Sequence, residues 1–361
     1  KDKKYRTIKR LEFVELYASR SLQCMYSLDK IVKNLNQTYN IVLESKSIKS
    51  LLGVQKRVPF DNRAAWWNRL TIKYIEGDKE KGDLDKLIFG ASTRDAREEE
   101  QENFSNIPVI DQFIKEASED NRWSVKTAKT LFELLIPNAF KDQLKRKGNI
   151  SWIVDSKTAS YPWELLQDDT KNAKPLCISS GMIRQLSVSD YRMNIKRVAQ
   201  QGALVVADPE LGDFIGQLPG AREEGLEVEN ILTSVGYPVN SLINTGPAEI
   251  TRELFSEEYS IIHLAGHGVF NPKSPRKSGM VIGDGMFLSV FDIQQLTIIP
   301  ELVFVNCCHL GLSSMADEKY YRNRYKLAAN IGTELIRIGV KAVIAAGWAV
   351  NDDAAKEFSK R

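Results

Sequence analysis

The sequence predicts an α/β fold in which a mostly parallel sheet is flanked by helices. Three short, mainly apolar runs carry this prediction, at residues 203–207, 259–265 and 302–306. Runs of this length with few polar side chains are typical of strands that are covered on both faces. Amphipathic segments at 218–234 and 327–338 complete a strand–helix alternation, which favours parallel strands with helices on the faces of the sheet.

The N-terminal residues 1–57 are expected to form a separate helical segment. Apolar residues recur there at spacings of three and four, as in Leu11, Val14 and Ala18, which is the period of an amphipathic helix. Neither Gly nor Pro occurs before Gly53. The pattern therefore predicts helices that pack against one another.

Residues 58–195 have the pattern of a smaller α/β half without evident catalytic groups. This half contains no His and one Cys, Cys177. Residues 69–75 alternate between apolar and polar side chains as a half-exposed strand does, whereas residues 92–106 are highly charged. The expected elements are strands at 69–75, 84–89 and 150–154 and a turn at 77–82. One helix is expected to begin at Pro108, and a second helix is expected over 124–140.

Residues 196–361 form the half in which the parallel sheet is predicted. Besides the three apolar strands, Gly283-Asp284-Gly285 separates two short apolar runs and predicts a β-hairpin. Residues 340–346 predict a further strand after the helix at 327–338. In sheets of this kind, reactive groups gather at the carboxyl ends of the strands.

Composition excludes several classes of function. Apolar residues make up 43% of the chain and charged residues 27%, as in soluble globular proteins. The net charge is only +3, so no direct nucleic-acid site is evident. No run of 18 apolar residues occurs, so no membrane span is predicted. The four cysteines, Cys24, Cys177, Cys307 and Cys308, show no disulfide spacing, and a reducing, cytoplasmic location is expected.

Two of the predicted strands end in reactive residues. One ends in the segment 263–268, which holds His263, His267 and Gly268, and the other in the segment 306–311, which holds Cys307, Cys308 and His309. All three histidines of the chain lie in these two segments. An imidazole lowers the pKa of a nearby thiol and later protonates the leaving amine. We therefore expect Cys308 to be a nucleophile assisted by His267, with the N–H groups of Gly268 and Cys308 as the oxyanion hole.

Three other interpretations of these residues compete with a peptidase site. A zinc site would use His263 and His267, but extended residues four apart are about 13 Å distant, and we expect no metal and no cofactor. A redox function would pair Cys307 with Cys308, although a disulfide between neighbours is strained. The third interpretation is that Cys and His only pack in a core. His263 is itself expected to be a hydrogen-bonded core residue, and His309 to lie at the mouth of the pocket.

At these residues the sequence resembles the CHAT family of caspase-like cysteine peptidases, which are related to caspases and separases. The segment 263–268 resembles the histidine motif of the family, and the segment 306–311 resembles its nucleophile motif. Further similar motifs are Tyr161-Pro-Trp-Glu-Leu-Leu, Asp208-Pro-Glu, Leu218-Pro-Gly-Ala-Arg-Glu-Glu and Ala346-Gly-Trp-Ala-Val-Asn-Asp-Asp. The resemblance covers about residues 60 to 361. Family members usually carry Ala and an acidic residue around the nucleophile, where this chain has Cys307 and His309.

The resemblance implies a caspase-like fold, with 58–195 as a pseudo-caspase half and 196–361 as the catalytic half. It assigns Cys308 as nucleophile, with Cys307 as the fallback, and His267 as the catalytic histidine. In related separases, an acidic residue after the last strand receives a basic side chain of the substrate, and Asp352 and Asp353 occupy that region here. Helix N-capping by Asp352 or Asp353 is an equal alternative.

The family further implies a cysteine endopeptidase that acts on a protein substrate and is switched on by an activating protein or ribonucleoprotein partner. Residues 1–57 would then be the edge of a sensor or regulatory region. The resemblance also implies a function in bacterial antiviral defence. The competing function is a catalytically silent caspase-like module that serves protein interaction.

Overall fold

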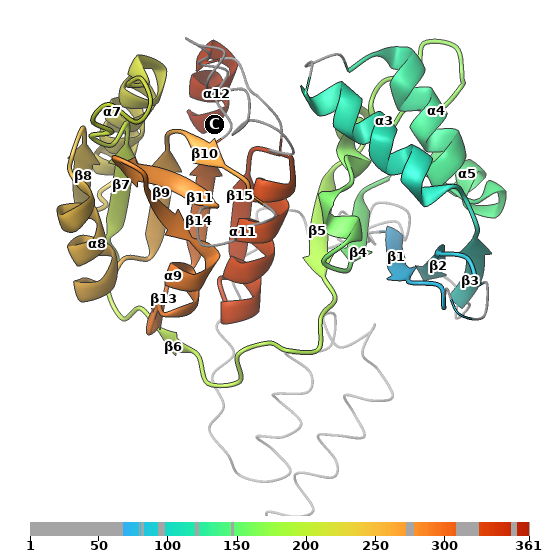
Figure 1. The fold of residues 1–361 in the computed structure, drawn as a ribbon, viewed down its shortest axis with the longest axis horizontal. Coiled ribbons are helices and arrows are strands. Elements are labelled where there is room, and N and C mark those ends of the chain that lie inside the picture. The colour runs from blue at the N-terminus through green and yellow to red at the C-terminus, as the bar shows by residue number, and fades with distance from the viewer. Residues whose placement is uncertain are drawn as a thin grey trace, which may run out of the picture. The chain divides into compact units, whose positions relative to one another are not determined.

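The computed structural model describes residues 68–78, 80, 83–92, 98–119, 123–145, 148–271, 278–307, 325–347 and 352–360. The chain divides into two compact units, Lys1–Ala65 and Trp66–Arg361, and every described residue belongs to the second unit. The helical segment predicted at 1–57 therefore lies outside the described residues. Figure 1 labels the helices and strands of the second unit.

The first sheet is mixed, and in the described residues its strand order is β3-β2-β1-β4-β5. Its strands are β1 (Asn68–Ile75), β2 (Lys86–Ser92), β3 (Glu98–Asn103), β4 (Ile150–Val154) and β5 (Met182–Leu186). The pairs β1–β4 and β4–β5 are parallel, whereas β2 is antiparallel to both of its neighbours. The accompanying helices are α3 (Ile107–Glu119), α4 (Val125–Leu135), α5 (Asn138–Lys145), α6 (Leu176–Ser179) and the 3₁₀ helices η2 (Thr158–Ser160) and η3 (Trp163–Leu165).

One expectation for this half was wrong, and one strand was not expected. The helix predicted at 124–140 is two helices, α4 and α5, because the residue before Pro137 is held extended: Ile136 has φ −90° and ψ 120°. The charged segment 92–106 contains the strand β3, whose sequence is Glu-Glu-Glu-Gln-Glu-Asn. Among the described strands, β3 pairs with β2 alone. It is therefore an edge strand of the described sheet, and charges are well tolerated on such strands.

Aromatic side chains fill the core of the first sheet. Trp152 of β4 stacks on Trp163 of η3 with ring centroids 5.0 Å apart, and Phe89 meets the edge of Trp163 at 6.3 Å. The indole N–H of Trp163 donates to the carbonyl of Thr158 at 2.9 Å. The motif Tyr161-Pro-Trp therefore serves packing, because both of its aromatic residues are fully buried.

The strand pairs described in the second sheet are all parallel, which agrees with the mostly parallel sheet that the sequence predicts. Its strand order, over the described part of the chain, is β15-β14-β9-β7-β8. These strands are β7 (Ala203–Ala207), β8 (Val239–Ile243), β9 (Ile261–Ala265), β14 (Leu302–Asn306) and β15 (Ala342–Ala345). The associated helices are α7 (Pro219–Ser234), α8 (Pro247–Ser256), α9 (Val290–Gln294), α11 (Tyr325–Ile338) and α12 (Asp352–Ser359). The strand β8 and the helix α8 are additions to the sequence-based expectation.

Different helices cover the two faces of this sheet (Figure 1). On one face, side chains such as Leu204, Leu264 and Val305 pack with apolar residues of α8, α9 and α11. On the other face, Ala207 and Ala265 pack with Ala221 of α7, and α12 packs on α7. Successive strand residues alternate between these two environments, because side chains in a strand point to opposite faces in turn.

A small antiparallel sheet adjoins the carboxyl end of β9. It consists of β10 (Gly268–Val269), β11 (Gly279–Gly283) and β12 (Met286–Ser289). The hairpin predicted around Asp284 and Gly285 is confirmed, and Gly285 supplies the positive φ of 65° that such a turn requires. Two short strands, β6 (Lys196–Arg197) and β13 (Ile298–Ile299), pair in parallel. Within the described residues, no helix is both long enough and apolar enough to cross a membrane.

Candidate active site

The histidine and cysteine motifs follow adjacent strands of the parallel sheet. β9 and β14 are paired neighbours, and their register places Ala265 opposite Asn306. The ladder continues one step further, because the N–H of Gly266 donates to the carbonyl of Asn306 at 3.1 Å. In the sequence, His267 is two residues beyond Ala265, and Cys308 is two residues beyond Asn306. Cys308 itself lies outside the described residues.

The imidazole of His267 is held in a defined orientation. The side chain is buried, with 3% exposure, and its Nε2 lies 2.9 Å from the carbonyl oxygen of Gly216. A carbonyl oxygen can only accept a hydrogen bond, so Nε2 carries the hydrogen of this contact. In the neutral ring Nδ1 is therefore the nitrogen without a hydrogen, and it can accept a proton and release it again.

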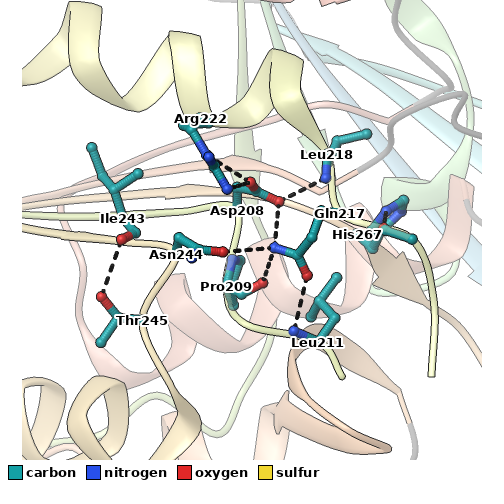
Figure 2. Close-up of polar contacts among 11 residues, drawn as sticks. Asp208, Pro209, Leu211, Gln217, Leu218, Arg222, Ile243, Asn244, Thr245 and His267 are labelled. Atoms are coloured by element: carbon teal, nitrogen blue, oxygen red, sulfur yellow. Dashed lines mark hydrogen bonds and ion pairs between the residues drawn. The ribbon is translucent and has the colours of Figure 1, made fainter. Parts of the chain in front are cut away.

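The loop that carries Gly216 is anchored on a buried carboxylate, that of Asp208. Figure 2 shows the donors around Asp208. Its Oδ1 accepts from the N–H of Leu218 at 2.6 Å and from Nε2 of Gln217 at 3.1 Å. Its Oδ2 lies 3.0 Å from a terminal nitrogen of the Arg222 guanidinium. These contacts fix the residues directly after Gly216 and so support the carbonyl that orients His267.

Two further features define the turn around Asp208. Its backbone is left-handed, with φ 45°, a conformation that Asp adopts more readily than most residues. Gln217 ties the loop together, because its Nε2 also donates to the carbonyl of Pro209 at 2.9 Å, and its Oε1 accepts from the N–H of Leu211 at 3.0 Å. The loop is thus closed on itself next to His267.

Gly268 lies against the peptide group that leads into Cys308. A Cβ added at Gly268 would lie 2.1 Å from the carbonyl oxygen of Cys307 and 2.5 Å from Cδ2 of Leu327. Gly268 is opposite Met280 in the β10–β11 pair, and the N–H of Val281 donates to the carbonyl of His267. This makes Gly268 and Met280 a non-hydrogen-bonded pair, so the N–H of Gly268 points away from β11.

The side chain of Cys307 belongs to the core. It is 1% exposed and packs in the cluster formed by β9, β14 and α11, and its sulfur lies 3.9 Å from the carbonyl oxygen of Leu264. A buried thiol in apolar surroundings is inert. This placement favours Cys308 over Cys307 as the reactive cysteine.

His263 is a buried core residue, as its position in the strand predicts. Its Nε2 lies 2.9 Å from Oε1 of Glu224, and its ring stacks on Phe304 at 4.8 Å. His263 and His267 therefore contact different partners, a carboxylate of α7 and a carbonyl of the 209–218 loop. The two imidazoles do not share a site of the kind that the zinc alternative requires.

The acidic residues proposed for the substrate pocket begin the last helix. Asp352 and Asp353 are the first two residues of α12, so they lie in its first turn and not at the N-cap position before it. Acidic side chains in the first turn stabilise a helix through its dipole. Asp353 is exposed. His309, expected at the mouth of the pocket, lies outside the described residues.

Sequence reasoning missed the residues that orient His267. Asp208 and Gln217 had no assigned function, although Asp208 directly follows a buried strand, where functional groups gather. Gly216 acts through its main-chain carbonyl, and a carbonyl leaves no signal in the residue type. Glu224 falls in the middle of an amphipathic helix, where the sequence does not distinguish a buried carboxylate from a solvated one.

The fold is that of a caspase-like α/β protein: the sheet is parallel, one of its strands leads into His267 and Gly268, and the neighbouring strand leads into a cysteine. The family model of the CHAT domain matches residues 125–361, and the chain belongs to this family. The match includes β4 and β5 of the first sheet and every described strand of the second sheet. No curated protein sequence matches the chain.

Proposed function

We propose that this CHAT protein is a cysteine endopeptidase that cleaves a protein substrate with Cys308 as nucleophile and His267 as acid and base. The observation that carries the proposal is the register of β9 and β14, in which Ala265 and Asn306 are directly paired. In the sequence, His267 and Cys308 each follow one of these two residues by two positions. The contact between the backbone of Gly268 and the carbonyl of Cys307 supports it, because it brings the two segments together beyond the strands.

The first chemical step is attack of the Cys308 thiolate on the carbonyl carbon of the scissile peptide bond. His267 accepts the thiol proton through Nδ1 while Nε2 stays bonded to the carbonyl of Gly216. The C–S bond forms, and the electron pair of the C=O bond moves to oxygen. The N–H groups of Gly268 and Cys308 stabilise that negative charge, and the direction of the Gly268 N–H away from β11 suits this function.

Collapse of the intermediate breaks the C–N bond and leaves a thioester on Cys308. His267 returns its proton to the leaving amine, so the first product departs as a neutral amine. Water then attacks the thioester while His267 takes a proton from it; the C–S bond breaks, His267 returns that proton to the sulfur, and the carboxylic acid product loses its own proton to solvent. Such a sequence needs no metal and no cofactor.

Substrate and partners follow from the same proposal. Asp352 and Asp353 would favour a substrate with Arg or Lys before the cleaved bond, through charge pairing with a cationic side chain. The activity would be switched on by a protein or ribonucleoprotein partner and would serve antiviral defence in the cytoplasm. A peptide library that is cleaved without preference for Arg or Lys would remove Asp352 and Asp353 from the substrate pocket.

The proposal is tested with a thiol-reactive peptide probe that carries a basic residue next to its electrophile, applied to the full chain with and without cell extract as a source of activator. We expect one covalent adduct, identified at Cys308 by mass spectrometry. His267→Ala is expected to lower the labelling rate by about 10²-fold or more, because general acid–base catalysis contributes about that much. Cys308→Ala is expected to abolish the adduct.

Two cysteines serve as matched controls. Cys177 is exposed as a residue, but its thiol is partly buried, and this burial together with the charge of Glu164 raises the pKa of the thiol. Cys177→Ser should therefore leave the labelling unchanged. Cys307→Ala should also keep the adduct. Failure of wild-type Cys308 to react under all of these conditions would favour the silent interaction module.

A further inference from the structure

A carboxylate without a function in the proposed reaction is buried behind the site. Glu224 is the sixth residue of α7, and its side chain is 1% exposed. An ionised group in such a position needs compensating polar partners, since transfer of an unpaired carboxylate into a protein interior is strongly unfavourable. Two hydrogen-bond donors and a histidine ring, from three other elements of the fold, lie against Glu224.

Each of these polar side chains lies on an element connected to the site. Nδ2 of Asn306, the last residue of β14, donates to Oε2 of Glu224 at 2.7 Å. Nε2 of His263 on β9 lies 2.9 Å from Oε1. The hydroxyl of Ser359 on α12 donates to the same Oε1 at 2.9 Å. Glu224 thus contacts β9 and β14, the two strands whose ends lead to His267 and Cys308.

The close packing of α7 on the sheet makes this contact pattern possible. At Gly225, a Cβ would lie 2.3 Å from the Cβ of Ala207 on β7. Any larger residue would push the helix away from the sheet. Because the neighbouring residue is glycine, Glu224 reaches the level of the strands and accepts from side chains that point toward α7.

Aromatic packing adjoins the same region. Phe304 and His263 are direct partners in the β9–β14 register, and their rings stack at 4.8 Å with an interplanar angle of 30°. Phe358 of α12 packs on Phe304 at 6.0 Å. The imidazole that contacts Glu224 is therefore itself packed against a neighbouring ring.

We propose that Glu224 is a positioning residue that holds the end of β14, and with it Cys308, in register with the end of β9 and His267. This inference rests on the proposed peptidase function. Asn306 is two residues before Cys308, so a shift of its side chain is passed to the nucleophile through only two peptide units. Glu224 contacts neither substrate nor the reacting atoms in this proposal, and acts through Asn306 and His263.

The test uses the probe assay on the full chain and separates the maximal inactivation rate from the probe concentration at half-saturation. Glu224→Ala is expected to lower the maximal rate by about 10²-fold, the usual effect of misplacing reacting groups by about 1 Å, and to leave the half-saturating concentration within about threefold. The matched control is Glu223→Ala, one residue earlier on α7. Glu223 is 63% exposed and pairs with Lys356, and this variant should react as the wild type does.

A pair of substitutions at the Glu224–Asn306 contact separates positioning from general destabilisation. Asn306→Asp places two carboxylates at the present 2.7 Å contact and is expected to lower the maximal rate by about 10²-fold. Adding Glu224→Gln restores a hydrogen bond of reversed polarity, with the amide of residue 224 as donor. The double variant keeps one negative charge at this contact, as in the wild type, and is expected to recover to within about tenfold of the wild-type rate.

The outcomes distinguish this inference from the proposed function. If wild-type Cys308 does not react at all, the peptidase proposal fails and the positioning inference fails with it. If the wild type reacts and Glu224→Ala reacts at the same rate, only the inference on Glu224 is overturned. Where Glu224→Ala does not fold, the Asn306 pair decides: a double variant no more reactive than Asn306→Asp overturns the inference, and a recovered rate supports it.

Discussion

The contact between Gly268 and Cys307 leads to a quantitative prediction for Gly268→Ala. The added Cβ would lie 2.1 Å from the carbonyl oxygen of Cys307, whereas real Cβ contacts are not closer than 3.0 Å. The two backbones must therefore separate by about 0.9 Å, the difference between 3.0 and 2.1 Å. The second close atom, Cδ2 of Leu327 at 2.5 Å, can turn away, but a main-chain carbonyl at the end of a strand cannot.

Gly268→Ala is expected to lower both the stability of the protein and the reactivity of Cys308. Overpacking of a tight core costs about 1–3 kcal/mol, and we place this substitution in the upper half of that range because the clash is with backbone. A loss of about 2–3 kcal/mol lowers the melting temperature of a domain of this size by about 4–12 °C. A displacement close to 1 Å next to Cys308 should also slow its reaction with the peptide probe by about 10²-fold.

Gly266→Ala is the matched control for Gly268→Ala. Gly266 lies two residues earlier in the same turn, and the atoms of the described residues that its Cβ would approach are Cε of Met280, at 3.0 Å, and Cδ of Pro209, at 3.4 Å. The end of a Met side chain can move aside, so this variant should lose less than about 1 kcal/mol. Thermal unfolding of the three proteins, followed by circular dichroism, provides the comparison. Equal melting temperatures for the two variants would refute the reasoning, independently of any enzymatic activity.

Further predictions concern groups away from this contact. Asp208→Ala should destabilise the protein by about 1–3 kcal/mol, because buried donors lose their acceptor, and Asp208→Asn should cost less, because Asn keeps one acceptor and tolerates the left-handed backbone; urea unfolding of both variants checks the order. Burial raises the pKa of Glu164, but the charge and hydrogen bonds of Arg184 outweigh it and lower this pKa below 4.5. The ion pair therefore stabilises the protein fully above about pH 4.5 and less as the pH falls below it. The difference in unfolding free energy between wild type and Glu164→Gln should shrink on acidification. A difference that grows would contradict the assignment. Burial and a hydrogen bond to Asp85 raise the pKa of Tyr74 to about 12; the phenolate absorbance lost in Tyr74→Phe should appear near that pH, and a midpoint near 10 would disprove the burial argument.

The sequence alone predicted the parallel sheet and the place of the site. Buried parallel strands must be apolar on both faces, so residues 203–207 and 302–306 are visible as short apolar runs. The strands end where polar residues begin, and this predicts His267 and Cys308 at one edge of the sheet before any coordinates are known; the structure describes His267 there, and Cys308 lies outside the described residues. The hairpin at Asp284-Gly285 is equally local, because its turn depends on the conformational freedom of glycine.

Local sequence gave less reliable boundaries where the backbone has competing preferences. The segment 124–140 has a continuous amphipathic pattern, and the restriction that Pro137 imposes on Ile136 decided where α4 ends. The charged strand β3 has little intrinsic strand preference, and its pairing with β2 decided its conformation.

Only the tertiary structure decided which groups orient the site. The packing of α7 and its preceding loop on the sheet brings three pairs of groups together. The carbonyl of Gly216 meets His267, the carboxylate of Asp208 meets the N–H of Leu218, and the carboxylate of Glu224 meets Asn306. A hydrogen bond between residues tens of positions apart depends on that packing and on distances of a few tenths of an ångström. Residue type and spacing do not encode such distances, whereas they do encode which faces of a strand or helix are buried.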